Sequence, residues 1–186
     1  MEINKNKKFE WNIINRMFHD NNNFLVKHHL ESYDDFYDVG LSNIIKENNP
    51  LKVVVGYDEE LDDFRVTCEL YIGGIDGNSI YYGKPIIYDD KRSHYMYPNE
   101  ARLRNMTYGF TIHYDVLIKL SYYNKENQVI RENITLPKIY MGRFPIMLQS
   151  KLCIIGKLNE NTKFNLGECK SDQGGYFIID GKEKII

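Results

Sequence analysis

The chain has 186 residues, of which 42% are hydrophobic and 13% aromatic, so its composition excludes an intrinsically disordered protein and its length allows one sizeable domain with a core. Its formal net charge of −2 excludes a general electrostatic attraction to nucleic acid, and any DNA contact must be local. No apolar run approaches the roughly 20 residues that cross a bilayer, and the start lacks the apolar stretch of a secretory signal. We therefore expect an intracellular protein without membrane contact. The frequent Asn, Lys, Ile and Tyr are typical of an AT-rich genome, as in large DNA viruses and some protists.

The first third of the chain has helical periodicity. Apolar residues recur at helical spacing between residues 9 and 19, which predicts an amphipathic helix with a core-facing stripe of Phe9, Ile13, Ile14, Met17 and Phe18. Ser32 followed by Asp35 indicates a capping arrangement that opens a second helix. Gly40 can divide this helix, and Pro50 lies beyond its end.

After Pro50 the pattern changes to short β-prone runs at residues 51–55 and 64–72. The acidic loop 58–63 between them allows a Ca²⁺ or Mg²⁺ site or a solvated turn, and it lacks the alternation of an EF-hand loop. Residues 73–77 are glycine-rich and predict a flexible hairpin turn, since they lack the Gly-Lys-Ser/Thr ending of a phosphate-binding loop.

The clearest strand is predicted at residues 110–122, where even positions are apolar and odd positions mostly polar. One face of this strand should be buried and the other wet. A polar turn at 124–127 and a returning strand at 129–136 predict an antiparallel hairpin. His113 on the polar face is interpreted as an exposed strand residue rather than a catalytic base. Residues 157–168 predict a short helix.

The C-terminal segment combines two kinds of turn. Gly174 and Gly175 are expected to serve the backbone, because glycine allows a positive φ and the close approach of another segment. Asp180-Gly181 is a favoured two-residue hairpin turn. Only residues 182–186 follow to form the return strand, so we expect the chain to be cut inside a structural unit.

These patterns predict an α+β fold, with N-terminal helices followed by a mainly antiparallel β-rich region. We expect a single domain over residues 1–186, with a helical start at 1–49 and a β-rich part at 50–186.

Three cysteines, Cys68, Cys153 and Cys169, are widely spaced without a Cys-x-x-Cys pair, which indicates a reduced compartment rather than a disulfide framework. A metal site formed by Cys153, Cys169 and a histidine, or a cysteine hydrolase using either thiol, can be drawn from these residues. Neither has the local spacing that such chemistry requires, so we interpret the three as ordinary thiols.

Positive charge gathers in two places. One basic cluster begins with Lys91, Arg92 and His94 and continues to Arg102 and Arg104. In the other, Arg143 and Lys151 flank the segment 144–146. Because arginine binds phosphate bidentately, the candidate nucleic-acid contacts are Arg102, Arg104, Arg143 and Lys151.

A structural role is the alternative for these residues. Glu100 and Arg104 are four apart and can pair on one helical turn, and we favour structural work for Arg102 and Arg104. For Arg143 and Lys151 both readings stay open.

Three segments resemble one known family. They are Tyr97–Tyr108 (YPNEARLRNMTY), Gly142–Cys153 (GRFPIMLQSKLC) and Gly167–Lys184 (GECKSDQGGYFIIDGKEK). Together, and in this order, they are similar to the N-terminal protrusion region of the second-largest, β-like subunit of multisubunit DNA-directed RNA polymerases. Gln149 departs from the family pattern, in which a basic residue is common at that position, and this weakens a phosphate-binding role for its segment.

The resemblance implies part of a much longer subunit that forms one wall of the DNA cleft in transcription. It implies as partners the other polymerase subunits, including the largest, the DNA template and initiation factors. The location implied is the nucleus for a cellular protein, or the host cytoplasm or virion for a viral one.

The resemblance also places the nucleotidyl transferase chemistry elsewhere. Mg²⁺ is held by aspartates of the largest subunit and Zn²⁺ by downstream segments, so we expect no catalytic residue, metal or cofactor in this chain and no activity of the chain alone. The alternative is a free-standing nucleic-acid- or protein-binding module derived from the protrusion, which would be expected to complete or cover the sheet edge at the last hairpin.

Overall fold

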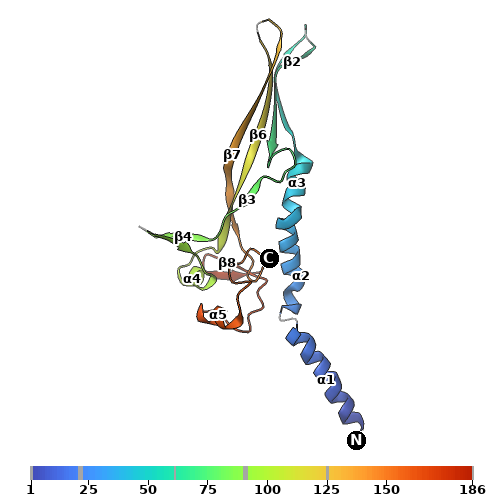
Figure 1. Ribbon diagram of the computed structural model, residues 1–186, viewed down its shortest axis with the longest axis vertical. Helices are drawn as coiled ribbons and strands as arrows, with labels where there is room; N and C mark the ends of the chain where they lie inside the picture. The colour runs from blue at the N-terminus through green and yellow to red at the C-terminus, as the bar shows by residue number, and fades with distance from the viewer. Residues whose placement is uncertain (1, 21–22, 61, 90–91, 125, 186) are drawn as a thin grey trace. The chain divides into compact units, whose positions relative to one another are not determined.

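The computed structural model describes residues 2–20, 23–60, 62–89, 92–124 and 126–185 (Figure 1). Lys91 of the first basic cluster, Leu61 of the acidic loop and the terminal Ile186 lie outside the described residues. In chain order the elements are α1 (Glu2–Asp20), η1 (Phe24–Val26), α2 (Lys27–Asp35), η2 (Phe36–Gly40), α3 (Leu41–Asn48), β1 (Leu51–Asp58), β2 (Asp63–Ile72), β3 (Ile80–Tyr82), β4 (Ile86–Asp89), β5 (Arg92–Tyr95), α4 (Pro98–Leu103), β6 (Gly109–Tyr123), β7 (Val129–Pro145), α5 (Glu160–Asn165), β8 (Phe177–Ile179) and β9 (Lys182–Lys184).

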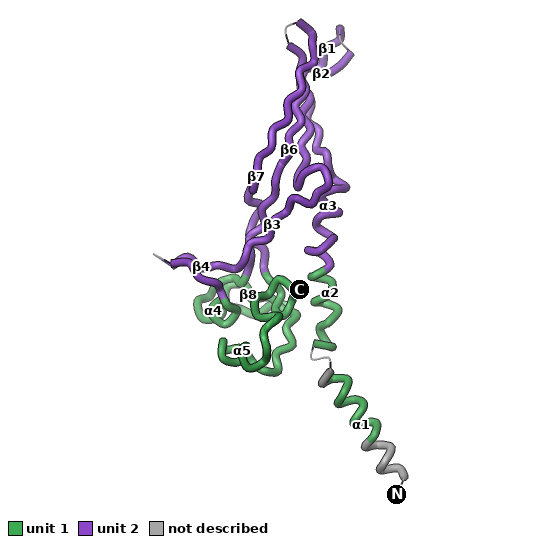
Figure 2. The backbone as a smooth tube through the Cα atoms, in the orientation of Figure 1, with its two compact units in different colours: residues 1–34, 97–108, 146–186 green, residues 35–96, 109–145 purple. Residues whose placement is uncertain are grey.

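The α+β class is confirmed, because the helices come first and the strand pairs are antiparallel. The chain divides into two compact units that interleave in sequence (Figure 2). Unit 1 contains Met1–Asp34, Tyr97–Tyr108 and Ile146–Ile186, and unit 2 contains Asp35–Met96 and Gly109–Pro145. Each unit thus takes segments from both the helical start and the β-rich part.

Unit 2 is built on a five-stranded sheet with the order β1-β2-β6-β3, in which β7 pairs with the other edge of β6. The predicted hairpin around residues 124–127 is confirmed, and Asn124 donates its backbone N–H to the Gln128 carbonyl. The observed β6 exceeds its predicted bounds by one residue at each end, while β7 continues nine residues beyond its predicted end at 136 (Figure 1). The short strands β3, β4 and β5 were not predicted.

The hairpin predicted at Gly73–Gly77 is wrong. β2 and β3 both pair with one edge of β6, β2 with Val116–Tyr122 and β3 with Ile112–Tyr114. The reason lies in the loop's own hydrogen bonds. Ser79 donates its N–H to the Gly73 carbonyl, and Asp115 of β6 donates to the Ser79 carbonyl. After β2 the chain therefore loops away from the edge of β6 and returns to the same edge as β3. Both strands are antiparallel to β6, so β2 and β3 run in the same direction.

The predicted helix opening at Ser32 and Asp35 is also wrong. The helix begins earlier, at Lys27, and directly follows the 3-10 turn η1. Ser32 and Asp35 lie inside it, and the Asp35 side chain makes no capping bond to η2. Gly40 does not divide the helix, because it ends the π-helical turn η2 with helical dihedrals and α3 follows at once.

The first helix, α1, is confirmed, but its predicted core-facing stripe is wrong. Its apolar side chains are exposed, from 43% at Ile14 to 67% at Phe9. Helical periodicity identifies a face that needs cover, and it does not identify which polypeptide supplies the cover.

The core of unit 2 lies where the π-helical turn meets the sheet. Tyr37 packs edge-to-face on Phe110 of β6 and on Tyr82 of β3, with ring centroids 5.3 and 5.9 Å apart. The predicted buried face of β6 is confirmed at Phe110, Ile112 and Val116. Beyond Val116 the β6 side chains are only half-buried.

The core of unit 1 forms around β8, where distant segments meet. Tyr108 donates its N–H to the Ile178 carbonyl, and Leu148 donates to the Tyr176 carbonyl. The Tyr33 ring of α2 lies 5.8 Å from the Phe177 ring. The predicted short helix is confirmed as α5, which Asn159 caps through a hydrogen bond from the Thr162 N–H.

Candidate nucleic-acid interface and the arginine cluster

The segment that carries Arg102 forms the short helix α4. Pro98 starts it at the first helical position, where its missing N–H is not needed. Ala101 faces inward and is fully buried, and Asn105 ends the turn with φ of 51°. This local geometry fixes the Cα of Arg102 beside the core of unit 1.

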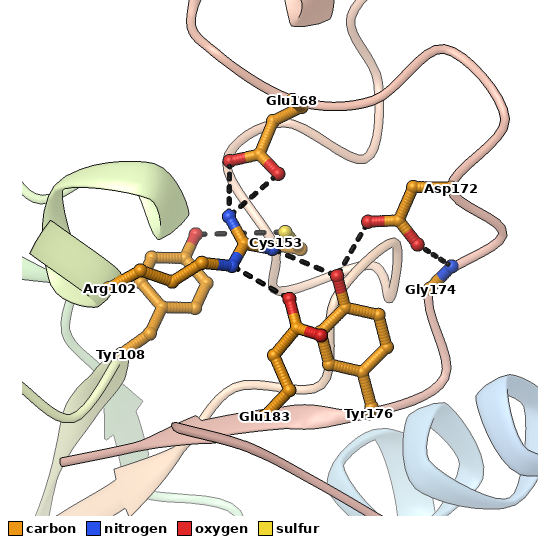
Figure 3. Close-up of polar contacts among 8 residues, drawn as sticks. All are labelled: Arg102, Tyr108, Cys153, Glu168, Asp172, Gly174, Tyr176 and Glu183. Carbon is orange, nitrogen blue, oxygen red and sulfur yellow. Dashed lines mark hydrogen bonds and ion pairs between the residues drawn. The ribbon is translucent and has the colours of Figure 1, made fainter. Parts of the chain in front are cut away.

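Arg102 uses all three nitrogens of its guanidinium group (Figure 3). Nη1 donates to both oxygens of Glu168, at 3.1 and 2.9 Å, and Nε donates to Glu183 at 2.8 Å. Nη2 donates to the Tyr176 hydroxyl at 2.8 Å, which in turn donates to Asp172 at 2.6 Å. The side chain of Glu168 is only 2% exposed. One arginine thus binds three side chains of the C-terminal segment directly and is linked to a fourth, Asp172, through the Tyr176 hydroxyl.

The electrostatics of this cluster follow from burial and pairing. Burial alone would lower the pKa of the Arg102 guanidinium, but the Glu168 carboxylate and the Tyr176 hydroxyl raise it above its ordinary value. Burial, followed by the hydrogen bond to Asp172, raises the pKa of Tyr176. Arg102 therefore stays charged and Tyr176 neutral near neutral pH.

The surroundings of Arg102 favour a structural role for this residue over contact with nucleic acid. It lines a surface hollow of about 370 Å³ together with the carboxylates of Glu168, Asp172 and Glu183. Three carboxylates around one guanidinium would repel a phosphate group. Contact with nucleic acid at Arg102 stays a prediction, and its observed bonds are those of a connector between α4 and the C-terminal segment.

The other three candidates are exposed. Arg104 pairs with Glu100 at 3.5 Å, so the predicted helical pair is confirmed. Lys151 donates its backbone N–H to the Asp34 carboxylate at 2.9 Å. Arg143 lies on β7, where its Nη2 approaches Met96 Sδ at 3.8 Å. Arg102, Arg104 and Lys151 belong to unit 1 and Arg143 to unit 2.

The backbone role predicted for Gly174 and Gly175 is confirmed. Their φ angles are 74° and 78°, and a Cβ on Gly174 would overlap the Leu148 carbonyl oxygen. A Cβ on Gly175 would lie 2.8 Å from Cβ of Val26. Gln149 accepts a hydrogen bond from Lys163 Nζ at 2.6 Å, so this departure from the family pattern has a local structural partner.

The predicted Asp180-Gly181 turn is confirmed as well. Both residues have positive φ, 51° and 74°, and β9 pairs back onto β8. Thr107 donates its hydroxyl to the Asp180 carboxylate at 3.2 Å, and Gly181 donates its N–H to the Met106 carbonyl. The hairpin is thus held against the α4 segment.

The partners of Arg102 were not found from the sequence. Glu168, Tyr176 and Glu183 lie in one family segment and Arg102 in another, between 66 and 81 positions away. The only available signal was the opposite charge of the two segments.

The thiols and acidic residues have ordinary surroundings. Burial raises the pKa of Cys153, which lies 3.6 Å from the Tyr108 hydroxyl, so the thiol keeps its proton, unlike an activated nucleophile. In the acidic loop, Asp58 pairs with Arg65 at 2.7 Å and Asp63 accepts from the Tyr123 hydroxyl. Within the described residues, no group of three or more His, Cys, Asp or Glu side chains is placed to hold a metal ion. No helix of this part of the chain is long and apolar enough to span a membrane.

The fold and the cluster define an α+β module in which Arg102 joins α4 to the C-terminal segment. Comparison with known proteins identifies its family. The family model described as RNA polymerase beta subunit matches residues 24–186, and the chain belongs to this family.

Its relatives include the second-largest subunits of several polymerases. DNA-directed RNA polymerase II subunit RPB2 of Eremothecium gossypii is 32% identical, over 95% of this chain and 15% of that relative. DNA-directed RNA polymerase III subunit RPC2 of Saccharomyces cerevisiae is 36% identical, over 87% of this chain and 12% of the relative. Subunit Rpo2N of Methanothermobacter thermautotrophicus is 29% identical, over 97% of this chain and 30% of the relative. The chain therefore spans only a small part of the length of these relatives, and the resemblance seen in the sequence is confirmed.

Proposed function

We propose that this chain is part of the second-largest subunit of a multisubunit DNA-directed RNA polymerase, in which it forms one wall of the DNA cleft. The observation that carries the proposal is the family match over residues 24–186. A scaffolding role is supported by the Arg102 cluster, which uses the charge of a family segment to hold the fold together. The chain contributes to transcription by positioning other parts and does not perform nucleotidyl transfer alone.

The proposed partners are the other polymerase subunits, including the largest, together with the DNA template and initiation factors. The proposed location is intracellular, with the other subunits. Mg²⁺ and Zn²⁺ belong, in this proposal, to parts of the polymerase outside residues 1–186.

For DNA contact we propose Arg104, Arg143 and Lys151 ahead of Arg102, whose guanidinium is already bonded to Glu168, Glu183 and Tyr176. Arg104, Arg143 and Lys151 are exposed, with the Arg104 side chain 43% exposed, and exposed cationic side chains are the ones that reach phosphate groups. In polymerase containing Arg104→Gln, Arg143→Gln or Lys151→Gln, DNA affinity should fall for all sequences alike. The slope of log affinity against log salt should fall by about one for each phosphate group that the variant no longer binds. An unchanged salt slope in all three single variants would remove these residues from the interface.

Affinity capture of the protein from its source tests the proposed function itself. We expect the largest polymerase subunit to co-purify in stoichiometric amount. Recovery of a 186-residue polypeptide without polymerase subunits would contradict the proposal and favour the free-standing binding module.

A further inference from the structure

The sheet of unit 2 has one strongly apolar face. The register of the strands places on one side the odd residues of β1 from Leu51 to Tyr57, the even residues of β2 from Phe64 to Leu70, and the even residues of β6 and β7 from Ile118 to Tyr122 and from Ile130 to Leu136. We call these residues the apolar sheet face. Every one is uncharged except Glu132, yet none of them is buried.

This face continues a surface that is covered further along the same strand. Phe110, Ile112 and Val116 are even residues of β6 and are buried, and Tyr37 of the π-helical turn packs on Phe110. Past Val116 the same side of β6 stays apolar but is only half-buried. On neighbouring β7, Ile134 is 44% exposed and Leu136 is 42% exposed. The apolar pattern is therefore longer than its cover.

The opposite face of the same strands is built for water. Arg65 pairs there with Asp58 at 2.7 Å, and Lys119 Nζ lies 4.6 Å from the centre of the Tyr71 ring. These partners satisfy charges at a wet surface. The contrast between the two faces indicates which side of the sheet a partner covers.

Glu132 defines the charge that the partner must carry. Its carboxylate accepts a hydrogen bond from the Tyr122 hydroxyl at 2.9 Å, and no lysine or arginine belongs to the apolar sheet face. Covering this face removes the carboxylate from water, which is costly unless a cation meets it. The covering surface must therefore be apolar with one basic side chain opposite Glu132.

We propose that the apolar sheet face is the docking surface for a segment of RNA polymerase polypeptide that lies outside residues 1–186 and brings a lysine or arginine to Glu132. The inference rests on the proposed function. Four strands about 4.8 Å apart and about seven residues long make a face on the order of 400 Å², the size at which an exposed apolar patch marks an interaction site. The relatives supply ample polypeptide for this purpose, since the chain covers 15% of the polymerase II subunits.

A second copy of this chain fits the surface less well. Two apolar sheet faces packed together would bury two Glu132 carboxylates and supply no cation to either. The partner's charge therefore distinguishes a polymerase segment from self-association.

Photo-crosslinking in assembled polymerase tests the proposal. A photoreactive phenylalanine analogue replaces Ile134, on the apolar sheet face, or its neighbour Asn133, on the opposite face of β7. We expect Ile134 to crosslink to a polymerase peptide outside residues 1–186 that contains a lysine or arginine, at a yield about tenfold above that of Asn133. Equal yields at both positions, or crosslinks between two copies of this chain, would overturn it. If no polymerase subunit is present in the purified sample, the proposed function has failed instead.

A charge scan supplies the second readout. Ile134→Asp should reduce incorporation of the chain into polymerase about tenfold or more, while Asn133→Asp should leave it unchanged. Glu132→Lys should also reduce it, because two cations would then meet. Ile134 is already exposed in this chain, so both aspartate variants should keep the melting temperature of the full-length subunit, which separates docking from folding. Normal incorporation of Ile134→Asp would refute the docking surface.

Discussion

Replacing Arg102 with methionine removes the residue that joins α4 to the C-terminal segment. Methionine fills much of the volume of the arginine stem but leaves Glu168, Glu183 and Tyr176 without their common donor. The effect should be large because of Glu168, whose side chain is 2% exposed. A buried carboxylate without its cation typically destabilises a protein by about 3–5 kcal/mol. We therefore expect Arg102→Met to lower the stability of unit 1 by about that amount.

The two carboxylates that Arg102 meets provide an internal comparison. Glu183 is 55% exposed, so its pair with Arg102 is screened by water, and Glu183→Gln should lower the stability by less than about 1 kcal/mol. The double variant Arg102→Met with Glu168→Met removes both buried charges, and it should be more stable than Arg102→Met alone. This last expectation is the one most specific to a buried ion pair.

Hydrogen exchange measures these differences unit by unit. The N–H groups of Tyr108 and Leu148 bind carbonyls beside β8 and report on unit 1, while amides shared by β6 and β7 report on unit 2. Arg102→Met should reduce protection in unit 1 and leave unit 2 unchanged. A loss below about 1 kcal/mol, or a double variant less stable than the single one, would refute the assignment of Arg102 as a buried connector.

Three further predictions concern other positions. Gly175→Ala should lower the free energy of unfolding by about 2–4 kcal/mol, because its positive φ and the nearby Val26 side chain both oppose a Cβ. Gly56→Ala has a similar φ, but its Cβ would make only an ordinary contact with Arg65 Cβ at 3.6 Å, so it should lower the free energy of unfolding by about 1 kcal/mol in urea denaturation. Burial raises the pKa of Tyr108, so the unfolded chain loses this proton first, and stability should fall as pH rises above about 10, by up to about 1.4 kcal/mol per pH unit, with a smaller slope in Tyr108→Phe. The Lys138 N–H lowers the pKa of Asp115, so the stability that this bond contributes is present above about pH 4 and lost below it. The protection factor of the Lys138 amide, its exchange rate in the unfolded chain relative to the folded one, should therefore fall on acidification, and this fall should be absent in Asp115→Asn, which has no titrating carboxylate.

Local sequence patterns correctly predicted those elements whose conformation depends only on neighbouring residues. Asp180-Gly181 forms the expected turn because both residues tolerate positive φ, which depends on nothing outside the turn. Gly73–Gly77 has equally good turn chemistry, but its flanking strands pair with β6, more than thirty positions away, and not with each other. Turn residues show that the chain bends, while the pairing of the strands decides where it goes.

The role of Arg102 depended on contacts that no local pattern contains. The Glu100–Arg104 pair was predictable because four positions on a helix set the distance. The bonds of Arg102 to Glu168 and Glu183 span 66 and 81 positions, so the same side chain was equally compatible with a phosphate group. The three carboxylates around it, which only the fold brings together, favour the structural role.

Burial was overpredicted in two places, and both have the apolar periodicity from which it was predicted. The α1 stripe in unit 1 and the far end of β6 in unit 2 have the periodicity of buried surfaces, and neither is buried. Periodicity shows that a face is apolar and needs cover, without showing which polypeptide covers it. The relatives are several times longer than 186 residues, and we propose that the cover of the apolar sheet face comes from polypeptide outside this chain. In the docking proposal, the uncovered apolar sheet face sets the apolar character of the partner, and its single carboxylate, Glu132, sets the partner's positive charge.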